Sequence, residues 1–180
     1  ELRVELEAQG HRFATSSDTE VILHLWEQHQ EGFADRLNGM FAVAIHDLAR
    51  GRVLLARDHV GIKPFYVAST PHGLVFGSEI KVLLASGWVD RKLDVDSLGQ
   101  FLSWEYVPGR RTLFAGIGRL PPGGLLDIDV SSSEVRESSF WRVPPPFTAE
   151  ASSSTRSADD WADEVDAAVH RAVRRQMVSD

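Results

Sequence analysis

Two predicted β-hairpins, joined by a short run of turn-forming residues, limit the fold of this chain more than any other feature. Strand-like patterns cover Met40–Asp47 and Arg52–Arg57, and again Pro64–Thr70 and Gly73–Ser78, with a turn inside each pair. Several of these strands are apolar throughout, as in Met40–Ile45. Because such strands have two apolar faces, we expect a sheet that is covered on both sides.

The segment between the hairpins has the composition of a shaped corner. Asp58 can accept hydrogen bonds from backbone N–H groups and open a turn. Gly61 can adopt backbone angles that other residues avoid, and Pro64 fixes the start of the next strand. Taken by itself, this chemistry favours a structural connection over a functional site.

Helical patterns lie on either side of the hairpins. Ser17–Glu20 matches a capping box, in which Ser17 and Glu20 would each bond the other's backbone N–H. Two late strands, Leu125–Val130 and Glu134–Trp141, are expected to pair. The predicted helices cover Glu1–Gln9, residues 17–30, Glu79–Ala85 and Asp94–Trp104.

A proline run and a serine run, Pro144–Pro146 and Ser152–Ser154, predict a linker over residues 143–156. Ser157–Asp160 is then expected to cap a helix whose apolar face has no evident partner in this chain. We therefore predict one domain over residues 1–142 and the first helix of a second over residues 157–180. Because the chain starts without Met and both ends lie inside helical patterns, we expect an internal piece of a longer protein.

Composition excludes several classes of function. The net charge of −7, from 19 basic and 26 acidic residues, argues against a nucleic-acid partner. No apolar run is long enough to cross a membrane, so we expect a cytoplasmic protein with no membrane partner. With no cysteine, the chain offers neither a disulfide nor a thiolate nucleophile.

The histidines suggest no metal centre. Glu20 and His24 have the i, i+4 spacing that can bind a metal on a helix, but the sequence offers no third ligand. A surface ion pair between them is the better interpretation, and no metal site is predicted in this chain.

The corner and the strand-to-helix segment Phe76–Lys81 together resemble the glutamine-hydrolysing asparagine synthetases, in the half that takes ammonia from glutamine. The order Arg-Asp-x-x-Gly-x-x-Pro, followed by Ser-Glu, recurs in class II glutamine amidotransferases, and the longer form around Gly61–Tyr66 is similar to asparagine synthetase in particular. Leu37–Ala42 and Leu120–Gly123 are similar to the same family. The resemblance covers residues 1–141.

The resemblance implies an α+β fold: the four-layer α-β-β-α sandwich of the N-terminal nucleophile hydrolases, with mainly antiparallel sheets, here incomplete at the N-terminus. It also implies an N-terminal Cys nucleophile, whose own α-amino group is the base, and an Asn-Gly oxyanion hole. Both would precede Glu1, so no catalytic residue is expected in this chain. Asn38–Gly39 matches a different family segment and is expected to be a turn.

Asp18 is the one substrate contact that the resemblance implies, as the carboxylate that holds the α-amino group of glutamine. A carboxylate against an ammonium would form a charge-assisted hydrogen bond. The sequence alone is equally compatible with an Asp that only stabilises the first turn of a helix. Architectural or domain-interface roles are expected for Arg57, Asp58, Gly61, Pro64, Ser78 and Glu79.

The resemblance further implies a parent protein that makes asparagine from glutamine, aspartate and ATP, with ATP and Mg²⁺ bound outside this chain, and a homodimer is compatible with it. The chain alone is expected to hydrolyse no glutamine. Three alternatives stay open: another class II amidotransferase, such as amidophosphoribosyltransferase or glucosamine-phosphate synthase; a related amidase or β-lactam synthetase with another acceptor; or a non-catalytic binding module of the same fold.

Overall fold

The computed structural model describes residues 1–144 and 156–177. It divides into two compact units, Glu1–Arg142 and Val143–Asp180. The predicted linker over residues 143–156, with its proline and serine runs, lies almost entirely outside the described residues, as do residues 178–180 of the predicted final helix.

The first unit contains the predicted helices and strands, with ends that differ by one or two residues from the sequence-based expectation. Its helices are α1 (Leu2–Ala8), α2 (Asp18–His29), the 3₁₀ turn η1 (Gln30–Gly32), α3 (Phe33–Arg36), α4 (Ile80–Ala85) and α5 (Val95–Trp104). Its strands are β1 (Ala42–Asp47), β2 (Arg52–Arg57), β3 (Tyr66–Thr70), β4 (Gly73–Gly77), β5 (Gly118–Arg119), β6 (Gly124–Asp129) and β7 (Val135–Ser139). The short elements η1, α3 and β5 were not predicted.

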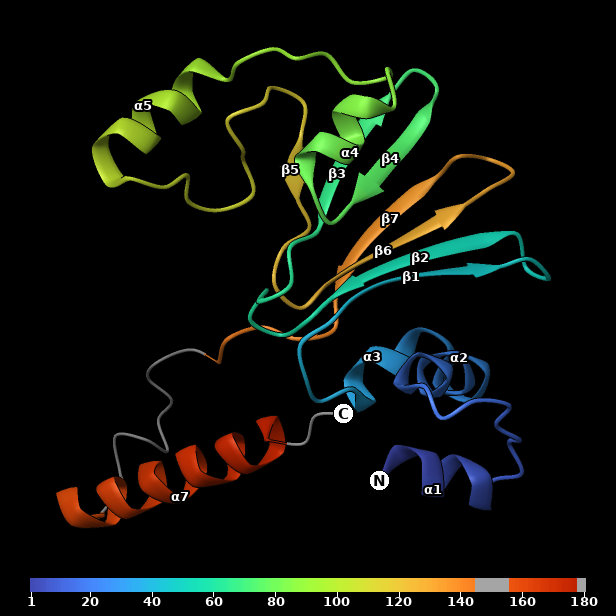
Figure 1. The fold of residues 1–180 in the computed structure, drawn as a ribbon, viewed down its shortest axis with the longest axis vertical. Coiled ribbons are helices and arrows are strands. Elements are labelled where there is room, and N and C mark those ends of the chain that lie inside the picture. Colours follow the sequence, from blue (N-terminus) through green and yellow to red (C-terminus); the bar gives the residue numbers. More distant parts are fainter. Residues whose placement is uncertain (145–155, 178–180) are drawn as a thin grey trace. The chain divides into compact units, whose positions relative to one another are not determined.

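The strands form two antiparallel sheets (Figure 1). Sheet A has the order β1-β2-β6-β7, and sheet B has the order β4-β3-β5. The first predicted hairpin is β1–β2, with Ala42 opposite Arg57, and the second is β3–β4, with Tyr66 opposite Gly77. The chain therefore crosses from sheet A to sheet B at the corner between them. The predicted pairing of the two late strands, β6 with β7, is confirmed.

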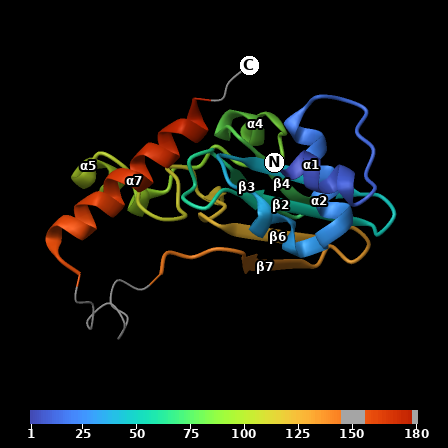
Figure 2. The ribbon, with the colours of Figure 1, turned by 90° about the horizontal axis from the view of Figure 1, so that it is seen from below.

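The two sheets pack face to face between layers of helices, and this arrangement confirms the four-layer α-β-β-α fold. Leu55 of β2 belongs to the cluster between the sheets, whereas its neighbour Leu54 belongs to the cluster under the helices α1–α3. Successive side chains of a strand point to opposite faces, so a strand covered on both sides must be apolar throughout. Figure 2 views the unit from the side on which α1 and α2 lie.

Three clusters make up the core, and each fully buried Leu in them stabilises the fold by about 2 kcal/mol. The helix-side cluster of sheet A includes Leu6, Leu25, Trp26, Phe33, Ile45 and Leu54. The cluster between the sheets includes Leu55, Phe65, Leu120 and Leu126. The cluster between sheet B and α4 includes Ala68, Leu83 and Ile117.

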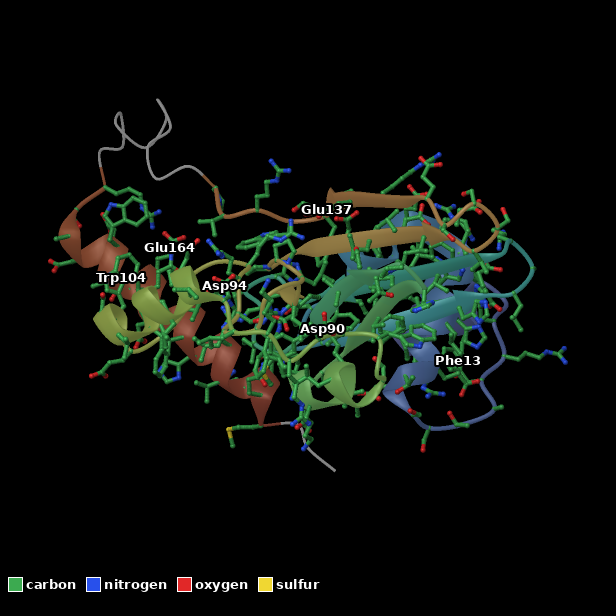
Figure 3. The ribbon with its side chains drawn as sticks, turned by 90° about the horizontal axis from the view of Figure 1, so that it is seen from above. Phe13, Asp90, Asp94, Trp104, Glu137 and Glu164 are labelled. Carbon is green, nitrogen blue, oxygen red and sulfur yellow. The ribbon has the colours of Figure 1, made fainter. Side chains whose placement is uncertain are left out.

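Helix α5 keeps most of its apolar side chains exposed. Its N-cap Asp94 accepts a hydrogen bond from the Ser97 backbone N–H at 2.9 Å, and Trp104 is its last residue (Figure 3). Leu102 is 74% exposed and Trp104 is 58% exposed. An apolar helix face was predictable here, but no packing partner covers it among the described residues of the first unit.

The start of α2 corrects one prediction. The Ser17 hydroxyl accepts a hydrogen bond from the Thr19 backbone N–H at 3.2 Å, so the N-cap is present. The Glu20 carboxylate, however, accepts hydrogen bonds from the backbone N–H groups of Ala14 and Thr15, at 2.6 and 2.7 Å, and not from that of Ser17. Both halves of the predicted capping box are therefore wrong: the Ser17 hydroxyl bonds the N–H of Thr19 and not that of Glu20, and the preceding turn offers the Glu20 carboxylate two other donors.

The second unit contains helix α7 (Ala158–Gln176), which has the complete capping box that α2 lacks. The Ser157 hydroxyl accepts from the Asp160 N–H at 3.1 Å, and the Asp160 carboxylate accepts from the Ser157 N–H at 2.8 Å. The apolar face of α7 is exposed, as predicted, at Trp161, Val165, Val169 and Val173. Over the described parts of both units, no helix combines the length and the apolar character needed to cross a bilayer.

Candidate functional site

The corner between the hairpins is organised around the buried carboxylate of Asp58, which is 1% exposed. Its two oxygens each accept a backbone N–H at 2.9 Å, one from Ile62 and one from Lys63. Its own backbone joins more distant segments, because its N–H donates to Phe41 O and its carbonyl accepts from the Gly123 N–H, both at 2.9 Å. Asp58 thus shapes its own turn and also links that turn to the lead-in of β1 and to the turn before β6.

Arg57 is buried beside it and directs its guanidinium at main-chain carbonyls. It donates to the carbonyls of Lys63 and Leu120, both at 2.7 Å, and to that of Gly61 at 2.6 Å. Burial lowers the pKa of Arg57, while the neighbouring charge of Asp58 raises it. A guanidinium fork can satisfy several acceptors in one plane, so this side chain fits a structural clasp better than a ligand contact.

Gly61 is required at the corner for two reasons. Its φ of +70° is a conformation that L side chains rarely adopt. A Cβ at this position would also lie 3.0 Å from Cγ of Pro122 and 3.1 Å from Cζ of Arg57. Pro64 lies exposed at the far end of the corner, next to the buried ring of Phe65.

Asp18, the predicted glutamine contact, is the exposed first residue of α2. Its carboxylate accepts a long hydrogen bond, 3.5 Å, from the Thr19 hydroxyl. Over residues 1–144, no hydrogen bond or ion pair joins Asp18 to the corner. The structure therefore does not bring Asp18 together with Arg57 and Asp58, and its role in binding stays a prediction.

Ser78 and Glu79 are both exposed and follow directly after β4. Because Tyr66 is opposite Gly77, they lie at the end of sheet B where the corner enters β3. Glu79 forms an ion pair with Lys81 at 2.6 Å and precedes α4 without a side-chain cap. Their predicted roles at a wall or domain interface remain untested by these contacts.

An aromatic group beside the corner was missed by sequence reasoning. The ring of His59 lies 5.2 Å from that of Phe140, 5.5 Å from that of Trp141 and 6.5 Å from that of Phe41, measured between centroids. Its members come from three separated segments, so no local pattern could reveal it. Gly123 packs against the same group, since a Cβ there would lie within 2.3 Å of the Trp141 carbonyl oxygen.

Two carboxylates beside or on helix α2 have strongly lowered pKa values: Glu20 in its first turn and Asp47 at the end of β1. The Thr15 hydroxyl, followed by the Ala14 backbone, lowers the pKa of Glu20 to about 2. The indole N–H of Trp26, 2.9 Å away, and then Arg50 lower the pKa of Asp47 to about 2. Both groups hold loops in place: Glu20 the segment before α2, and Asp47 the turn between β1 and β2.

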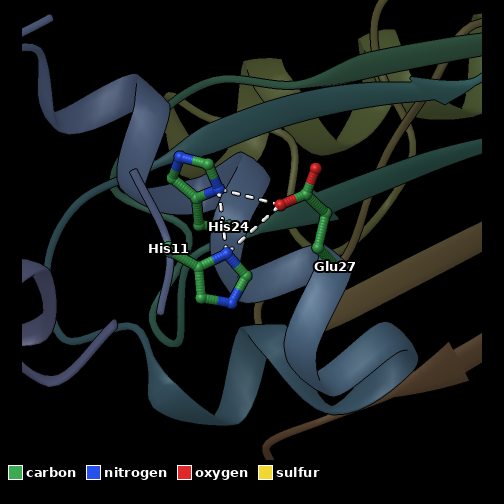
Figure 4. Close-up of side chains that lie close together, drawn as sticks. All are labelled: His11, His24 and Glu27. Carbon is green, nitrogen blue, oxygen red and sulfur yellow. Dashed lines mark hydrogen bonds and ion pairs between the residues drawn. The ribbon is translucent and has the colours of Figure 1, made fainter. Parts of the chain in front are cut away.

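The structure brings together residues that could hold a metal, which the sequence did not suggest. His11, His24 and Glu27 present three ligand atoms that all lie within 4.8 Å of one another (Figure 4). The contact expected between Glu20 and His24 is present, with Nε2 of His24 3.7 Å from Oε1 of Glu20. The cluster replaces Glu20 of the sequence pattern by Glu27, and it adds His11 from the segment before the helix.

Two solved structures share this architecture. One is the glutamine phosphoribosylpyrophosphate amidotransferase of Bacillus subtilis with ADP and GMP, at a TM-score of 0.51 and 22% identity over 77% of this chain and 26% of that one. Another, described as the allosteric regulatory enzyme of purine biosynthesis, has a TM-score of 0.54 and 22% identity over 77% of this chain and 25% of that one. At this identity the likeness shows the fold, which is that of the N-terminal nucleophile amidotransferases.

Residues 1–141 match the family described as glutamine amidotransferase domain, and the chain belongs to that family. Glutamine-hydrolyzing asparagine synthetase 3 of Bacillus subtilis (strain 168) is 36% identical over 182 residues, which are 100% of this chain and 28% of that protein. Glutamine-hydrolyzing asparagine synthetase 1 of the same organism is 39% identical over 128 residues, covering 71% of this chain and 20% of that protein. The chain thus spans between a fifth and just over a quarter of the length of these relatives.

Proposed function

We propose that this chain is the glutamine-using part of an asparagine synthetase. The observation that carries the proposal is the 36% identity to an enzyme of that name over the whole chain, helix α7 included. The parent would hydrolyse glutamine to glutamate and ammonia in the domain to which residues 1–142 belong. A further domain, beginning with α7, would use ATP and Mg²⁺ to adenylate aspartate, and ammonia would attack that intermediate.

The chain itself would form the scaffold of the glutamine site and provide one contact with the substrate. It contains no cysteine, so the proposed nucleophile, an N-terminal Cys with its own α-amino group as base, would come from outside these residues. The Asn-Gly oxyanion hole would come from outside them as well. We extend the proposal to a cytoplasmic parent, in keeping with aspartate and ATP as substrates, and a homodimer is compatible with it.

Asp18 is proposed to bind the α-amino group of glutamine. Its carboxylate is exposed and has only the long contact with the Thr19 hydroxyl in the described part of the chain, so it can accept a hydrogen bond from an ammonium. The Ser17 cap and the Glu20 contacts fix the backbone on both sides of it. A charge-assisted hydrogen bond contributes about 1.5–3 kcal/mol, which corresponds to roughly 10- to 100-fold in binding.

The test compares glutamine-dependent with ammonia-dependent asparagine formation by the full-length parent. Asp18→Asn is expected to raise KM for glutamine by roughly 10- to 100-fold and to leave ammonia-dependent synthesis unchanged. Asp35→Asn is the matched control, because Asp35 is also an exposed carboxylate in the first turn of a helix, α3. An unchanged KM in the Asp18 variant would exclude the contact.

Other outcomes separate the parts of the proposal. If the parent hydrolyses glutamine but forms no asparagine from aspartate and ATP, the acceptor is another acid and the assignment to asparagine synthesis is wrong. If the purified 180-residue chain hydrolyses glutamine, the proposal of a nucleophile outside these residues is wrong.

A further inference from the structure

Three side chains converge where the segment after α1 meets helix α2 (Figure 4). Nδ1 of His11 lies 3.2 Å from Nδ1 of His24 and 3.4 Å from Oε2 of Glu27, and Nδ1 of His24 lies 2.8 Å from the same oxygen. His24 and Glu27 are three positions apart on α2 and therefore share a face. Both imidazoles are 15% exposed and the carboxylate is 59% exposed, so the group is sheltered on one side and open on the other.

These separations are those of ligands around one small divalent ion. Zinc binds imidazole nitrogen and carboxylate oxygen at about 2.0–2.2 Å, and two such ligands in a tetrahedron are then about 3.3 Å apart. The three edges of the present triangle are 2.8, 3.2 and 3.4 Å. A fourth position would face the open side next to Glu27, where water can enter.

In each imidazole, Nε2 points away from the three converging atoms. Its position also matches that of the second nitrogen in metal-bound histidines. Nε2 of His11 lies 3.2 Å from the side-chain amide oxygen Oε1 of Gln28, an acceptor, so the His11 proton is placed on Nε2 and its lone pair on Nδ1. Nε2 of His24 lies 3.7 Å from the Glu20 carboxylate. Metal-ligating histidines usually direct their second nitrogen at a carbonyl or a carboxylate in this way, which fixes the tautomer.

In neither neutral tautomer of His24 do both ring nitrogens face a suitable hydrogen-bond partner. With its proton on Nδ1, the buried Nε2, which has no hydrogen-bond partner in the described residues, would turn a lone pair toward the Glu20 carboxylate. With its proton on Nε2, the Nδ1 lone pair would face both the His11 lone pair and the Glu27 carboxylate. A cation between the three inner atoms removes this conflict, because all three then act as ligands.

We propose that His11, His24 and Glu27 bind a divalent transition-metal ion of the zinc type, in a site that serves structure and not glutamine chemistry. The ion would join the segment after α1 to helix α2 and so hold the outer helices on sheet A. A ligand that binds only the folded state raises its stability in proportion to the logarithm of its free concentration over Kd. The proposal does not depend on the proposed enzyme activity.

The experiment uses protein without an affinity tag, stripped of metal with a chelator. Zinc is titrated by calorimetry, and cobalt(II) by its visible absorption, which reports nitrogen and oxygen ligands in a tetrahedron. Glu27→Ala removes an exposed ligand at a helical position, where alanine is well tolerated. Glu7→Ala on α1 is the matched carboxylate control, and His72→Ala in the β3–β4 turn is the control for incidental binding by surface histidines.

We expect one zinc per chain, a higher thermal midpoint with zinc, and at least tenfold weaker binding in Glu27→Ala and His11→Ala. Both control variants should bind as the wild type does. His11→Ala is assessed by circular dichroism as well, so that a loss of binding is not confused with a loss of fold. Zinc binding of equal strength in the wild type and the Glu27→Ala variant would overturn the proposal. The absence of zinc binding by the wild type would also overturn it.

Discussion

Replacing Gly61 by alanine tests whether the corner holds the two sheets together. The glycine has a φ of +70°, and a Cβ there would lie 3.0 Å from Pro122 Cγ and 3.1 Å from Arg57 Cζ. The substitution therefore has two effects that can be measured apart: a backbone cost, and a displacement of the neighbouring side chains.

The expected loss of folding free energy in Gly61→Ala is the sum of these two effects. A left-handed conformation costs an L residue about 1–2 kcal/mol. The new methyl group also pushes on the guanidinium of Arg57, which donates to three carbonyls at 2.6–2.7 Å. A hydrogen bond from a charged group contributes about 1.5–3 kcal/mol, so the loss of one raises the total destabilisation to about 3–5 kcal/mol.

The assay is urea denaturation of the 180-residue chain, followed by circular dichroism. Gly51→Ala is the matched control, since Gly51 has a φ of +63° in the β1–β2 turn and nothing lies within 4 Å of a Cβ there. The free energy of unfolding of Gly51→Ala should fall only by the cost of the left-handed backbone conformation, about 1–2 kcal/mol. If the two variants lose the same free energy of unfolding, the contact with Arg57 and Pro122 contributes nothing and the argument for a clasp fails.

Two further substitutions test the Arg57 hydrogen bonds at the corner and the Glu20 carboxylate in the first turn of α2. Arg57→Lys is expected to lower the free energy of unfolding by about 2–4 kcal/mol in the same urea assay, because one ammonium cannot reach three carbonyls; a loss below about 0.5 kcal/mol would contradict this. Glu20 has a folded pKa of about 2, below its usual 4.5, so its stabilising contribution is full above pH 4.5 and is lost as the pH falls from 4.5 to about 2. The thermal midpoint of Glu20→Gln should therefore lie below that of the wild type at pH 6 and approach it near pH 2, whereas a constant difference would refute the assignment.

Much of the fold was predictable because its signals are local. The strands of both hairpins are short, largely apolar runs, and their turns carry glycine. Gly118–Arg119 is too short for a periodic pattern, so β5 was missed for lack of signal. Helix α5 illustrates a different limit: its sequence predicts an apolar face, but sequence periodicity does not reveal whether anything covers that face.

The candidate site was predictable only where its contacts join residues that lie close together in the sequence. Asp58 accepts from Ile62 and Lys63, four and five residues onward, and a turn-opening Asp was expected there. Its contact with Gly123 spans the whole second hairpin and more, and nothing in the local sequence indicates it. His11 likewise meets His24 from a distance of 13 residues, so a search for ligand spacing on one helix could not find the cluster.

The long-range contacts explain how a motif can identify this fold without carrying its chemistry. The chain crosses between the sheets twice, from β2 to β3 and from β5 to β6. Two consecutive residues tie the crossings together: Arg57 donates to the carbonyl of Leu120, and the carbonyl of Asp58 accepts from the N–H of Gly123. Opening either contact would leave a buried polar group unpaired where the sheets are joined. In this chain the Arg57–Asp58 pair therefore has an architectural role that does not depend on the reaction of the parent. The corner therefore does not indicate which acceptor substrate the parent uses. That information must come from residues outside the corner that contact the substrate.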